Sequence, residues 1–262
     1  MLIICNGTFK SGSSWIHAIV LELCRVKQMN LSVIPSLYNP NVKSPTRILE
    51  KNLALFLNNE EYIKSTYLTK AHYFSKSTLG VNYSENVKFI FIERDIKDAI
   101  VSHFYHFNNY RKIGLSFGIY FNFIGVFKAY EMFLFNERCK ANFNENLFFS
   151  FEGFKSSFLS SIKRLCKVLE MELLSDFELL EIQKNTSLNK MKDIAKKGGN
   201  QYYPELKGDS HKLFRKGNIG DWKEHFSMNN LRILNKIENK KPSVYIKIGY
   251  FILFTLRRKI GF

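Results

Sequence analysis

A glycine-rich turn directly follows the first apolar run of the chain, and it limits the fold more than any other feature. The run is Leu2–Cys5, the turn extends from Gly7 to Gly12, and a helical pattern follows over Ser14–Val26. A strand, a tight turn and a helix N-terminus in this order form an anion cradle, because backbone N–H groups and the helix dipole point at one place. The sequence therefore predicts a phosphate-binding turn at the end of a buried strand.

The spacing of the two glycines fits the frame of a Walker A nucleotide-binding loop, G-x-x-x-x-G-K-[ST]. Ser13 stands where that loop has its lysine, and Lys10 lies inside the turn instead. We therefore expect the backbone cradle to be kept and the nucleoside triphosphatase signature to be lost. A glycine pair behind a strand is also compatible with a simple tight turn.

Apolar runs alternate with helical patterns along the chain, which favours a parallel sheet with crossover helices. Strands are expected at Leu2–Cys5, Thr66–Thr69, Val87–Ile92 and Leu147–Phe151. Helices are expected at Ser14–Val26, Thr46–Leu57, Ile96–Phe107, Phe117–Cys139 (broken near Gly125), Ser157–Glu170 and Asn229–Asn239, with a long loop over 196–221. We predict the α/β class, with a P-loop-NTPase-like parallel sheet flanked by helices on both faces. The sheet belongs to a single domain over residues 1–241, and a tail follows at 242–262.

The chain is strongly basic, since 39 Lys and Arg against 23 Asp and Glu give 262 residues a formal net charge of +16. This excess favours an anionic partner, although it serves solubility equally well. The four cysteines are scattered and have no metal-ligand spacing, so we expect reduced thiols and no metal. No signal peptide precedes the first strand and no run of about 20 apolar residues occurs, so we expect a cytoplasmic protein.

Two further strand ends carry polar side chains suited to a phosphorylated ligand. Lys70 and His72 follow the second expected strand, and Arg94 follows the third, with Ser102 eight residues later. Ligands of doubly wound sheets gather at the carboxyl ends of the strands. A guanidinium and a hydroxyl can hold a second phosphate, so we expect a nucleotide phosphorylated at two positions.

The helix expected after the third strand carries its own start signal. Asp95 precedes the helix and is expected to be its N-cap, and Asp98 completes a capping-box-like pair three residues later. On that helix Asp98 and Ser102 share one face. A surface ion pair between Arg94 and Asp98 is the alternative interpretation.

Five segments of the chain match, in order, motifs that occur together in one enzyme family. They are Phe9–Trp15 for [YF]-P-K-S-G-T-[TS]-W, Lys70–His72 for K-x-H, Arg94–Ser102 for R-[ND]-P-K-D-x-x-x-S, Asn185–Met191 for a segment beside adenine, and Phe214–Lys223 for R-K-G-x-x-G-D-W-K. Phe9 and Ile96 replace the prolines of two motifs. On these residues the chain resembles, over nearly its whole length, the cytosolic-type sulfotransferases that use 3′-phosphoadenosine 5′-phosphosulfate.

The resemblance implies in-line transfer of the sulfuryl group from this donor to a hydroxyl acceptor, with adenosine 3′,5′-bisphosphate as the product. It implies that Lys10 stabilises the leaving phosphate and that His72 takes the proton of the acceptor. The catalytic residues implied are His72, Lys10, Lys70 and Ser102. The donor-binding residues implied are Lys10, Ser11, Gly12, Ser13, Ser14, Trp15, Arg94, Ser102, Thr186, Ser187, Arg215, Lys216 and Gly217, of which Trp15, Thr186 and Ser187 hold the adenine side. No metal is implied, since lysine and arginine supply the positive charge.

Two other functions remain open at this point, a P-loop kinase that uses ATP and a non-catalytic protein that binds nucleic acid or membrane. The missing Walker lysine argues against the kinase, and we expect no nucleic-acid partner. The acceptor is open among carbohydrates, glycolipids, peptide tyrosines and small alcohols. The segment after Trp222 lacks the motif K-x-x-x-T-V-x-x-x-E, so the sequence leaves the oligomeric state unknown.

The C-terminal tail combines an apolar stretch with basic residues. Val244–Leu256 is apolar and aromatic with one lysine, and Arg257, Arg258 and Lys259 follow it. Such a segment is too short to span a bilayer but suits a helix that lies on an anionic membrane surface. A final helix packed on the domain is the alternative interpretation.

Overall fold

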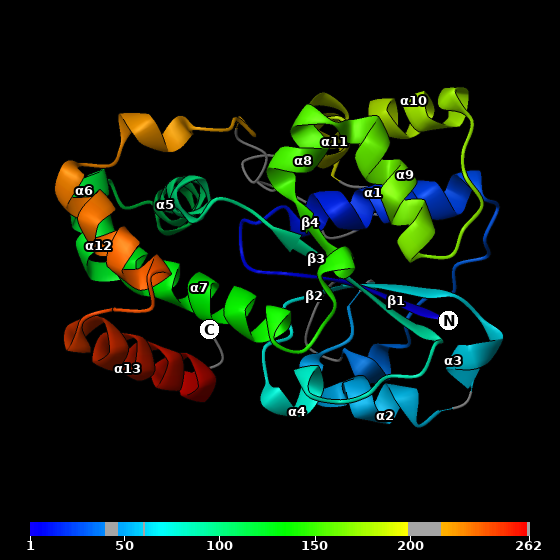
Figure 1. Cartoon of the computed structure of the whole chain (residues 1–262), viewed down its shortest axis with the longest axis horizontal. Coiled ribbons are helices and arrows are strands. Elements are labelled where there is room, and N and C mark those ends of the chain that lie inside the picture. Colours follow the sequence, from blue (N-terminus) through cyan, green and yellow to red (C-terminus); the bar gives the residue numbers. More distant parts are fainter. Residues whose placement is uncertain (40–46, 60, 199–215, 261–262) are drawn as a thin grey trace. The chain divides into compact units, whose positions relative to one another are not determined.

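The computed structural model of the protein describes residues 1–39, 47–59, 61–198 and 216–260 (Figure 1). The chain divides into two compact units, each built from two stretches of sequence. The first unit consists of Met1–Arg94 and Cys139–Gly217, and the second of Asp95–Arg138 and Asn218–Phe262. The predicted boundary between residues 241 and 242 stays a prediction.

The first unit is built on a parallel sheet of four strands in the order β2-β1-β3-β4. The strands are β1 (Leu2–Gly7), β2 (Tyr67–Ala71), β3 (Val87–Glu93) and β4 (Phe148–Ser150). Every residue of β1 is buried, as the continuous apolar run predicts for the centre of a parallel sheet. All four strands were expected, and each lies within two residues of its predicted range.

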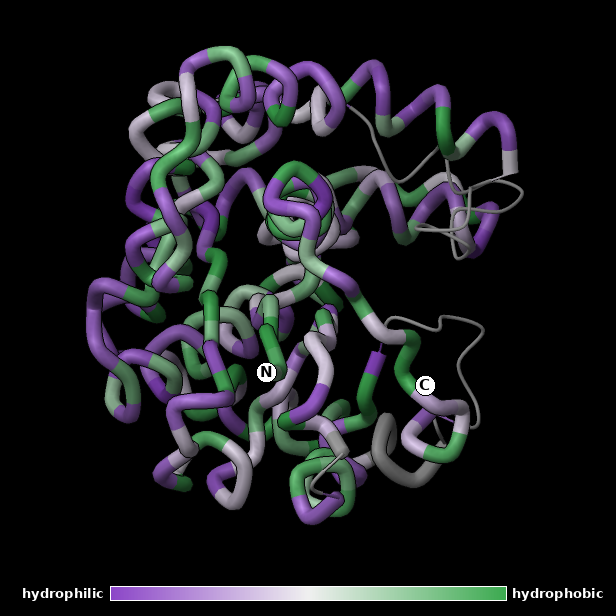
Figure 2. The backbone as a smooth tube through the Cα atoms, turned by 90° about the vertical axis from the view of Figure 1, so that its right-hand side faces the viewer, coloured by the Kyte–Doolittle hydropathy of each residue, from purple (hydrophilic) through white to green (hydrophobic). Residues whose placement is uncertain are grey.

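Helices flank both faces of this sheet. On one face lie α1 (Ser13–Val26), α8 (Phe151–Ser156), α9 (Phe158–Val168), α10 (Asp176–Asn185) and α11 (Leu188–Lys196) (Figure 1). On the other lie α2 (Leu53–Leu57), α3 (Glu61–Lys64) and α4 (Lys76–Leu79). The tube in Figure 2 shows hydrophilic and hydrophobic segments in alternation along the helices, as amphipathic packing against a sheet requires. The predicted α/β fold with a P-loop-like parallel sheet is confirmed.

One expected helix of the first unit is wrong over most of its range. A helix was expected over Thr46–Leu57, but the described part has an extended stretch to Leu49, a 3-10 turn η2 (Glu50–Asn52) and only then α2. Ile48 donates its backbone N–H to Thr69 Oγ1 (3.0 Å), and its carbonyl accepts from the Tyr73 hydroxyl (2.9 Å). These contacts use the backbone groups that a helix would need, so the segment stays extended.

Short turns complete the first unit, and its core lies between the sheet and the larger helix layer. The 3-10 turns are η1 (Ser36–Tyr38) and η4 (Glu145–Leu147). Residues of β1, α1, α9, α10 and α11 meet in one apolar cluster with Ile3, Ile19 and Ile162 fully buried. The four cysteines of the chain are buried free thiols.

The second unit is helical throughout its described part. It contains α5 (Ile96–Arg111), α6 (Phe117–Tyr120), the π-turn η3 (Phe121–Gly125), α7 (Val126–Lys140), the 3-10 turn η6 (Asp221–Glu224), α12 (Met228–Glu238) and α13 (Val244–Ile260). Near Gly125, where a break was expected, the helical region stays continuous but changes to π geometry, and a Cβ on Gly125 would lie only 3.0 Å from the Tyr120 ring. Helix α5 extends four residues beyond its predicted end.

The cap predicted for α5 is half right. Asp95 caps the helix and accepts the backbone N–H groups of Lys97 (2.7 Å) and Asp98 (3.3 Å). The expected reciprocal bond from Asp98 is wrong, because its carboxylate accepts from Gly220 and Trp222 instead. The capping-box pattern in the sequence therefore predicted the start of the helix correctly. It predicted the role of Asp98 incorrectly.

Candidate active site

The turn between β1 and α1 has a backbone that few other residues would permit. Gly12 has φ +100° and Lys10 has φ +59°, so both lie in the left-handed region. A Cβ on Gly7 would lie 2.6 Å from Ile92 Cγ2 and 2.9 Å from the Ile92 carbonyl oxygen, so only glycine fits there. Ser11 holds the turn by donating its hydroxyl to the Thr8 carbonyl (2.8 Å).

The turn is suited to an anion in two respects. Helix α1 begins at Ser13, and among the described residues no side chain caps its first N–H groups, which leaves them for a ligand. The Thr8 hydroxyl is buried, and it makes no hydrogen bond within the part of the chain that the structure describes. Buried polar groups without a partner are rare in proteins, and a water or an ion commonly supplies the missing bond. The turn therefore fits a phosphate group.

Two basic side chains at the end of β2 lie against this turn. Lys70 is buried and donates its Nζ to Ser14 Oγ at 3.1 Å. The ring Nδ1 of exposed His72 hydrogen-bonds the Gly7 carbonyl oxygen. A carbonyl only accepts, so Nδ1 carries the proton of the neutral ring and Nε2 carries the lone pair. The K-x-H element and the turn thus lie together, as their places at adjacent strand ends predict.

Asn6 holds the segment that carries His72, a role that was not predicted from the sequence. Its side chain is buried and binds the neighbouring residue Tyr73 twice, accepting the Tyr73 N–H at 2.8 Å and donating to the Tyr73 carbonyl at 3.2 Å. The two bonds hold the backbone of the segment that carries His72. A polar residue at the end of an otherwise apolar strand was the signal that could have identified it.

Burial and neighbouring positive charges keep a second histidine, close to Lys70, neutral. His17 on α1 is 2% exposed, and burial, followed by the positive charges of Lys70 and Arg47, lowers its pKa to about 3. The imidazole therefore adds no charge beside Lys70 at neutral pH.

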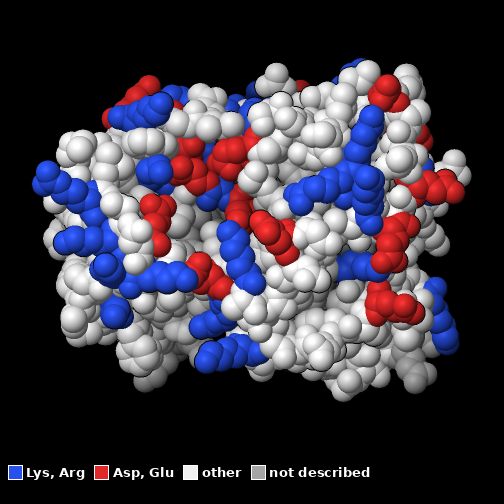
Figure 3. All heavy atoms as spheres, viewed as in Figure 1, with Lys and Arg blue, Asp and Glu red and all other residues white. Residues whose placement is uncertain are grey.

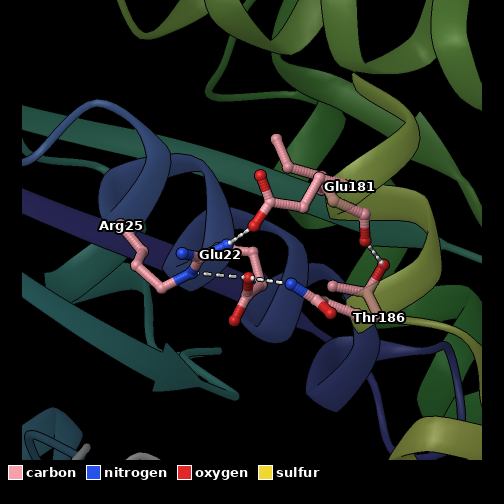
Figure 4. Close-up of polar contacts among 6 residues, drawn as sticks. Glu22, Arg25, Glu181 and Thr186 are labelled. Atoms are coloured by element: carbon pink, nitrogen blue, oxygen red, sulfur yellow. Dashed lines mark hydrogen bonds and ion pairs between the residues drawn. The ribbon is translucent and has the colours of Figure 1, made fainter. Parts of the chain in front are cut away.

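Trp15 and Thr186, both predicted to hold adenine, lie in contact. The indole Nε1–H of Trp15 donates to the Thr186 carbonyl at 2.9 Å, and Ser187 caps α11 by accepting from the Lys190 N–H. Two contacts hold the end of α10 against α1, namely Arg25 with Glu181 (2.5 Å) and Asn185 with Glu22 (3.0 Å) (Figure 4). Within α1, Glu22 also binds Arg25 (2.9 Å), and the Thr186 hydroxyl donates to the Ile182 carbonyl of its own helix end (2.8 Å).

Phe151, which follows β4, contacts four residues of the predicted motifs. Its ring lies 5.2 Å from the Trp15 ring and 4.2 Å from the Arg94 guanidinium carbon. A Cβ on Gly12 would lie 3.0 Å from it, and one on Gly217 would lie 3.9 Å from it. From the sequence, Phe151 was expected only as the end of a strand. Its position at the carboxyl end of the fourth parallel strand was the signal that it belongs to the site.

The second unit holds the remaining part of the R-K-G-x-x-G-D-W-K segment. Asp98 is 1% exposed and accepts the backbone N–H groups of Gly220 (2.7 Å) and Trp222 (3.0 Å). Lys97 Nζ lies 5.0 Å from the Trp222 ring centroid. The alternative of an ion pair between Arg94 and Asp98 stays a prediction. Ser102 lies one turn after Asp98 on α5 and is partly buried.

The predicted site residues fall into three groups. The first unit contains Lys10, Ser11, Gly12, Ser13, Ser14, Trp15, Lys70, His72, Arg94, Thr186, Ser187, Lys216 and Gly217, the second unit contains Ser102, and Arg215 lies outside the described residues. Within the first unit, the turn, Lys70 and His72 form one cluster, and Phe151 gathers Trp15, Arg94 and Gly217. The roles of all of these residues stay predictions. In the described part of the chain, no group of three or more His, Cys, Asp or Glu side chains could hold a metal ion.

Known proteins resemble the chain along most of its length. Mouse sulfotransferase 2A1 is 25% identical over 242 residues, which is 88% of this chain and 81% of that protein. Flavonol 3-sulfotransferase from Flaveria bidentis is 24% identical over 264 residues, which is 88% of this chain and 78% of that protein.

Solved structures share the fold. The crystal structure of mouse sulfotransferase SULT7A1 complexed with PAP covers 97% of this chain and 88% of that one, with a TM-score of 0.67 and 20% identity. Retinol dehydratase in complex with androsterone and inactive cofactor PAP covers 92% of this chain and 80% of that one, with a TM-score of 0.59 and 16% identity. The family model of the sulfotransferase domain matches residues 2–243. The chain therefore belongs to the sulfotransferase family, and the sulfotransferase activity predicted from its motifs is confirmed.

Proposed function

We propose that this sulfotransferase takes its sulfuryl group from 3′-phosphoadenosine 5′-phosphosulfate and that the turn over residues 7–15 receives the 5′-phosphosulfate. One observation carries the proposal: Lys70 and His72 are both held against this turn, by Ser14 Oγ and the Gly7 carbonyl. The turn then has an anion cradle, a buried ammonium and a ring nitrogen with a lone pair in one place. This is the set of groups that transfer of an anionic group to a hydroxyl needs.

The positive groups of the turn stabilise the leaving phosphate. The bound donor supplies an activated sulfuryl group on a phosphate that leaves as adenosine 3′,5′-bisphosphate. Lys10, Lys70 and the first N–H groups of α1 are the donors for the negative charge that grows on this phosphate. Lys70 is 6% exposed, and a charge that is shielded from water interacts more strongly with the charge beside it.

His72 acts as the general base in this proposal. Its Nδ1–H donates to the Gly7 carbonyl, which leaves Nε2 as the nitrogen that accepts the proton of the acceptor hydroxyl. The bonds from Asn6 to Tyr73 fix the backbone that carries the ring. A positioned base of this kind contributes about 10²–10⁴-fold to a rate.

Residues of the first unit around Phe151 hold the nucleotide. Trp15 and Phe151 supply flat apolar surface for the adenine, with the Thr186 segment beside them. Arg94 and Gly217, which contact the same Phe151 ring, hold the 3′-phosphate with Lys216. Guanidinium groups suit this role because their planar donors match phosphate oxygens. The proposal also includes the roles that the sequence resemblance implies for Ser187, Ser102 and Arg215.

We propose a small organic hydroxyl compound as the acceptor. The relatives at 24–27% identity include enzymes named for flavonols, and they match 88–89% of this chain. Carbohydrates and glycolipids are the other acceptors that the sequence leaves open. A panel of flavonols, steroid alcohols, simple phenols and sugars, assayed with donor labelled on its sulfate, identifies the class.

Ligand binding and transfer test the proposal separately. Adenosine 3′,5′-bisphosphate should raise the melting temperature, and ATP at the same concentration should raise it less, because binding to the native state alone stabilises it. Labelled sulfate should then appear on at least one hydroxyl compound of the panel. Stabilisation by ATP alone, or equal stabilisation by both nucleotides, would contradict the proposed donor.

A further inference from the structure

Helix α13 presents an apolar face to solvent. Its large hydrophobic side chains include Tyr245, which is 58% exposed, and four aliphatic or phenyl side chains that are more than half exposed: Val244 (69%), Ile248 (55%), Phe251 (68%) and Ile252 (51%). These four stand at positions i, i+4, i+7 and i+8 of the helix, so they lie along one face. Contiguous apolar faces of this kind on a folded protein mark sites of interaction with another surface.

The opposite face of α13 is packed, which fixes the orientation of the exposed one. Ile246 is 4% exposed, and Gly249 lies against the Phe127 ring, where a Cβ would collide with it. The Tyr250 ring lies 5.4 Å from the Tyr130 ring of α7. The helix therefore buries one apolar face within its own unit. The exposed apolar face is a second one, which packing within the unit does not use.

The charged residues of α13 are all basic. After Glu238 the sequence contains no acidic residue, while Lys247, Arg257, Arg258 and Lys259 fall within α13. Lys247 is exposed beside the apolar face. In Figure 3, Lys and Arg (blue) and Asp and Glu (red) are both scattered over the face that is shown. An apolar helix face with only basic charges complements a surface that is apolar inside and anionic outside.

We propose that α13 docks on the surface of an anionic lipid bilayer, with its exposed apolar face at the boundary between headgroups and acyl chains. The basic charge that the sequence gives this stretch favours anionic headgroups, and the exposed apolar side chains enter the boundary layer. No described helix is long and apolar enough to cross a membrane, so the helix lies along the surface. A second copy of the chain is a poorer occupant, because two basic helices would bring like charges together. The proposal does not depend on the sulfuryl donor.

Co-sedimentation with vesicles tests the proposal, using phosphatidylcholine alone and phosphatidylcholine mixed with phosphatidylglycerol. The intact chain should pellet with the mixed vesicles, and much less with phosphatidylcholine alone. The double variant Ile248→Glu, Phe251→Glu should lower the partition coefficient on mixed vesicles at least about tenfold, because two apolar anchors become acidic. Replacing Arg257, Arg258 and Lys259 by glutamine should lower it about a hundredfold, since each basic residue contributes about fivefold near an anionic surface.

A matched control separates docking from general surface apolarity. Phe177 and Leu180 on α10 are 78% and 55% exposed, so Phe177→Glu with Leu180→Glu changes the same kind of side chain elsewhere. This variant should bind mixed vesicles as the unchanged chain does. Circular dichroism checks that every variant is folded.

Three results would overturn the proposal. One is equal binding of the α13 double variant and the unchanged chain, and another is no binding of the unchanged chain to mixed vesicles. The third is a dimer in sedimentation velocity that the α13 double variant converts to a monomer, which would make the face an interface between copies. Sulfuryl transfer in solution is measured without vesicles, so failure here leaves the proposed donor untouched.

Discussion

Asp98 and Gly220 are 122 residues apart, and the Gly220 backbone N–H donates to the Asp98 carboxylate at 2.7 Å. The other carboxylate oxygen accepts the Trp222 N–H at 3.0 Å. Asp98 is 1% exposed, so both bonds lie away from water. The start of α5 therefore fixes the backbone of the G-D-W segment in the second unit.

Removal of this carboxylate should destabilise the protein. Asp98→Ala removes two hydrogen bonds to a charged acceptor and leaves two N–H groups without it, so we expect the free energy of unfolding to fall by about 3 kcal/mol. Urea denaturation measures the change. Asp193→Ala, which truncates an exposed aspartate on α11, is the control and should stay within about 0.5 kcal/mol. A loss below 1 kcal/mol for Asp98→Ala would mean that water replaces the carboxylate.

The strands were predictable because the pattern that marks them lies in their own residues. The helix expected over Thr46–Leu57 was wrong because contacts with residues distant in the sequence decide its structure. Buried parallel strands are continuous apolar runs, so β1 and β3 could be found from their own residues. The segment before α2 has a helical pattern, but Ile48 bonds to Thr69 and Tyr73 across the unit. A tertiary contact that takes backbone groups overrides local propensity. Helix α10 was missed although its capping box, Ser175 with Glu178, is visible in the sequence.

The candidate site was predictable where it depends on the ends of strands, and not where it depends on contacts between distant segments. Turns at the carboxyl ends of parallel strands meet at one edge, so Lys70, His72 and the turn at Gly7 were expected to lie together. The partners of Asp98 were hidden, since no local pattern connects it to residues 220 and 222. The role of Phe151 was hidden for the same reason, because ring contacts depend on packing between distant segments.

A methyl group at Gly7 should disrupt the turn. The Cβ of Gly7→Ala would lie 2.6 Å from Ile92 Cγ2 and 2.9 Å from a backbone oxygen, so strand β3 or the turn must move. We expect a loss of about 1–3 kcal/mol in the free energy of unfolding, together with weaker binding of adenosine 3′,5′-bisphosphate. Gly118→Ala on α6, where nothing lies within 4 Å of the new Cβ, is the control and should be neutral or slightly stabilising. Equal stability of both variants would show that the turn adapts.

His17 should make the stability of the protein fall in acid. Its pKa is about 3 in the folded chain, mainly because it is buried, and its ordinary value is 6.5. Between these values the unfolded chain binds a proton that the folded chain does not, so the free energy of unfolding decreases as the pH drops below about 6.5. At about pH 5 the decrease from this group is about 2 kcal/mol.

A variant isolates this contribution. His17→Gln removes the titrating ring, so the difference in unfolding free energy between about pH 7.5 and pH 5 should shrink by about 2 kcal/mol relative to the unchanged chain. Urea denaturation at the two pH values gives the four numbers needed. His106→Asn, at a histidine that is only half-buried, should keep most of the dependence. If His17→Gln keeps the full dependence, other groups are responsible for it.

The Phe151 ring should matter for the nucleotide. Phe151→Leu keeps an apolar side chain but loses the contacts with the Trp15 ring and the Arg94 guanidinium, each worth about 0.5–1.5 kcal/mol. We expect the affinity for adenosine 3′,5′-bisphosphate to fall about tenfold in calorimetric titration. Phe148→Leu in β4 removes a stacked ring pair with Phe91 of the neighbouring strand β3 and should leave the affinity unchanged. The same loss in both variants would point to a change in the sheet and not in the nucleotide site.

Replacement of His72 should separate binding from transfer. The side chain is exposed and its Nδ1 bonds the Gly7 carbonyl, so His72→Ala removes this hydrogen bond and the proposed base. We expect the affinity for adenosine 3′,5′-bisphosphate to stay within about threefold, while the rate of sulfuryl transfer falls about 10²–10⁴-fold. Titration with the bisphosphate and single-turnover transfer of labelled sulfate measure the two quantities, and His106→Asn is the control at a histidine outside the site. A His72→Ala enzyme with near-normal transfer would remove this residue as the base, whereas a parallel loss of bisphosphate binding would assign it to holding the turn.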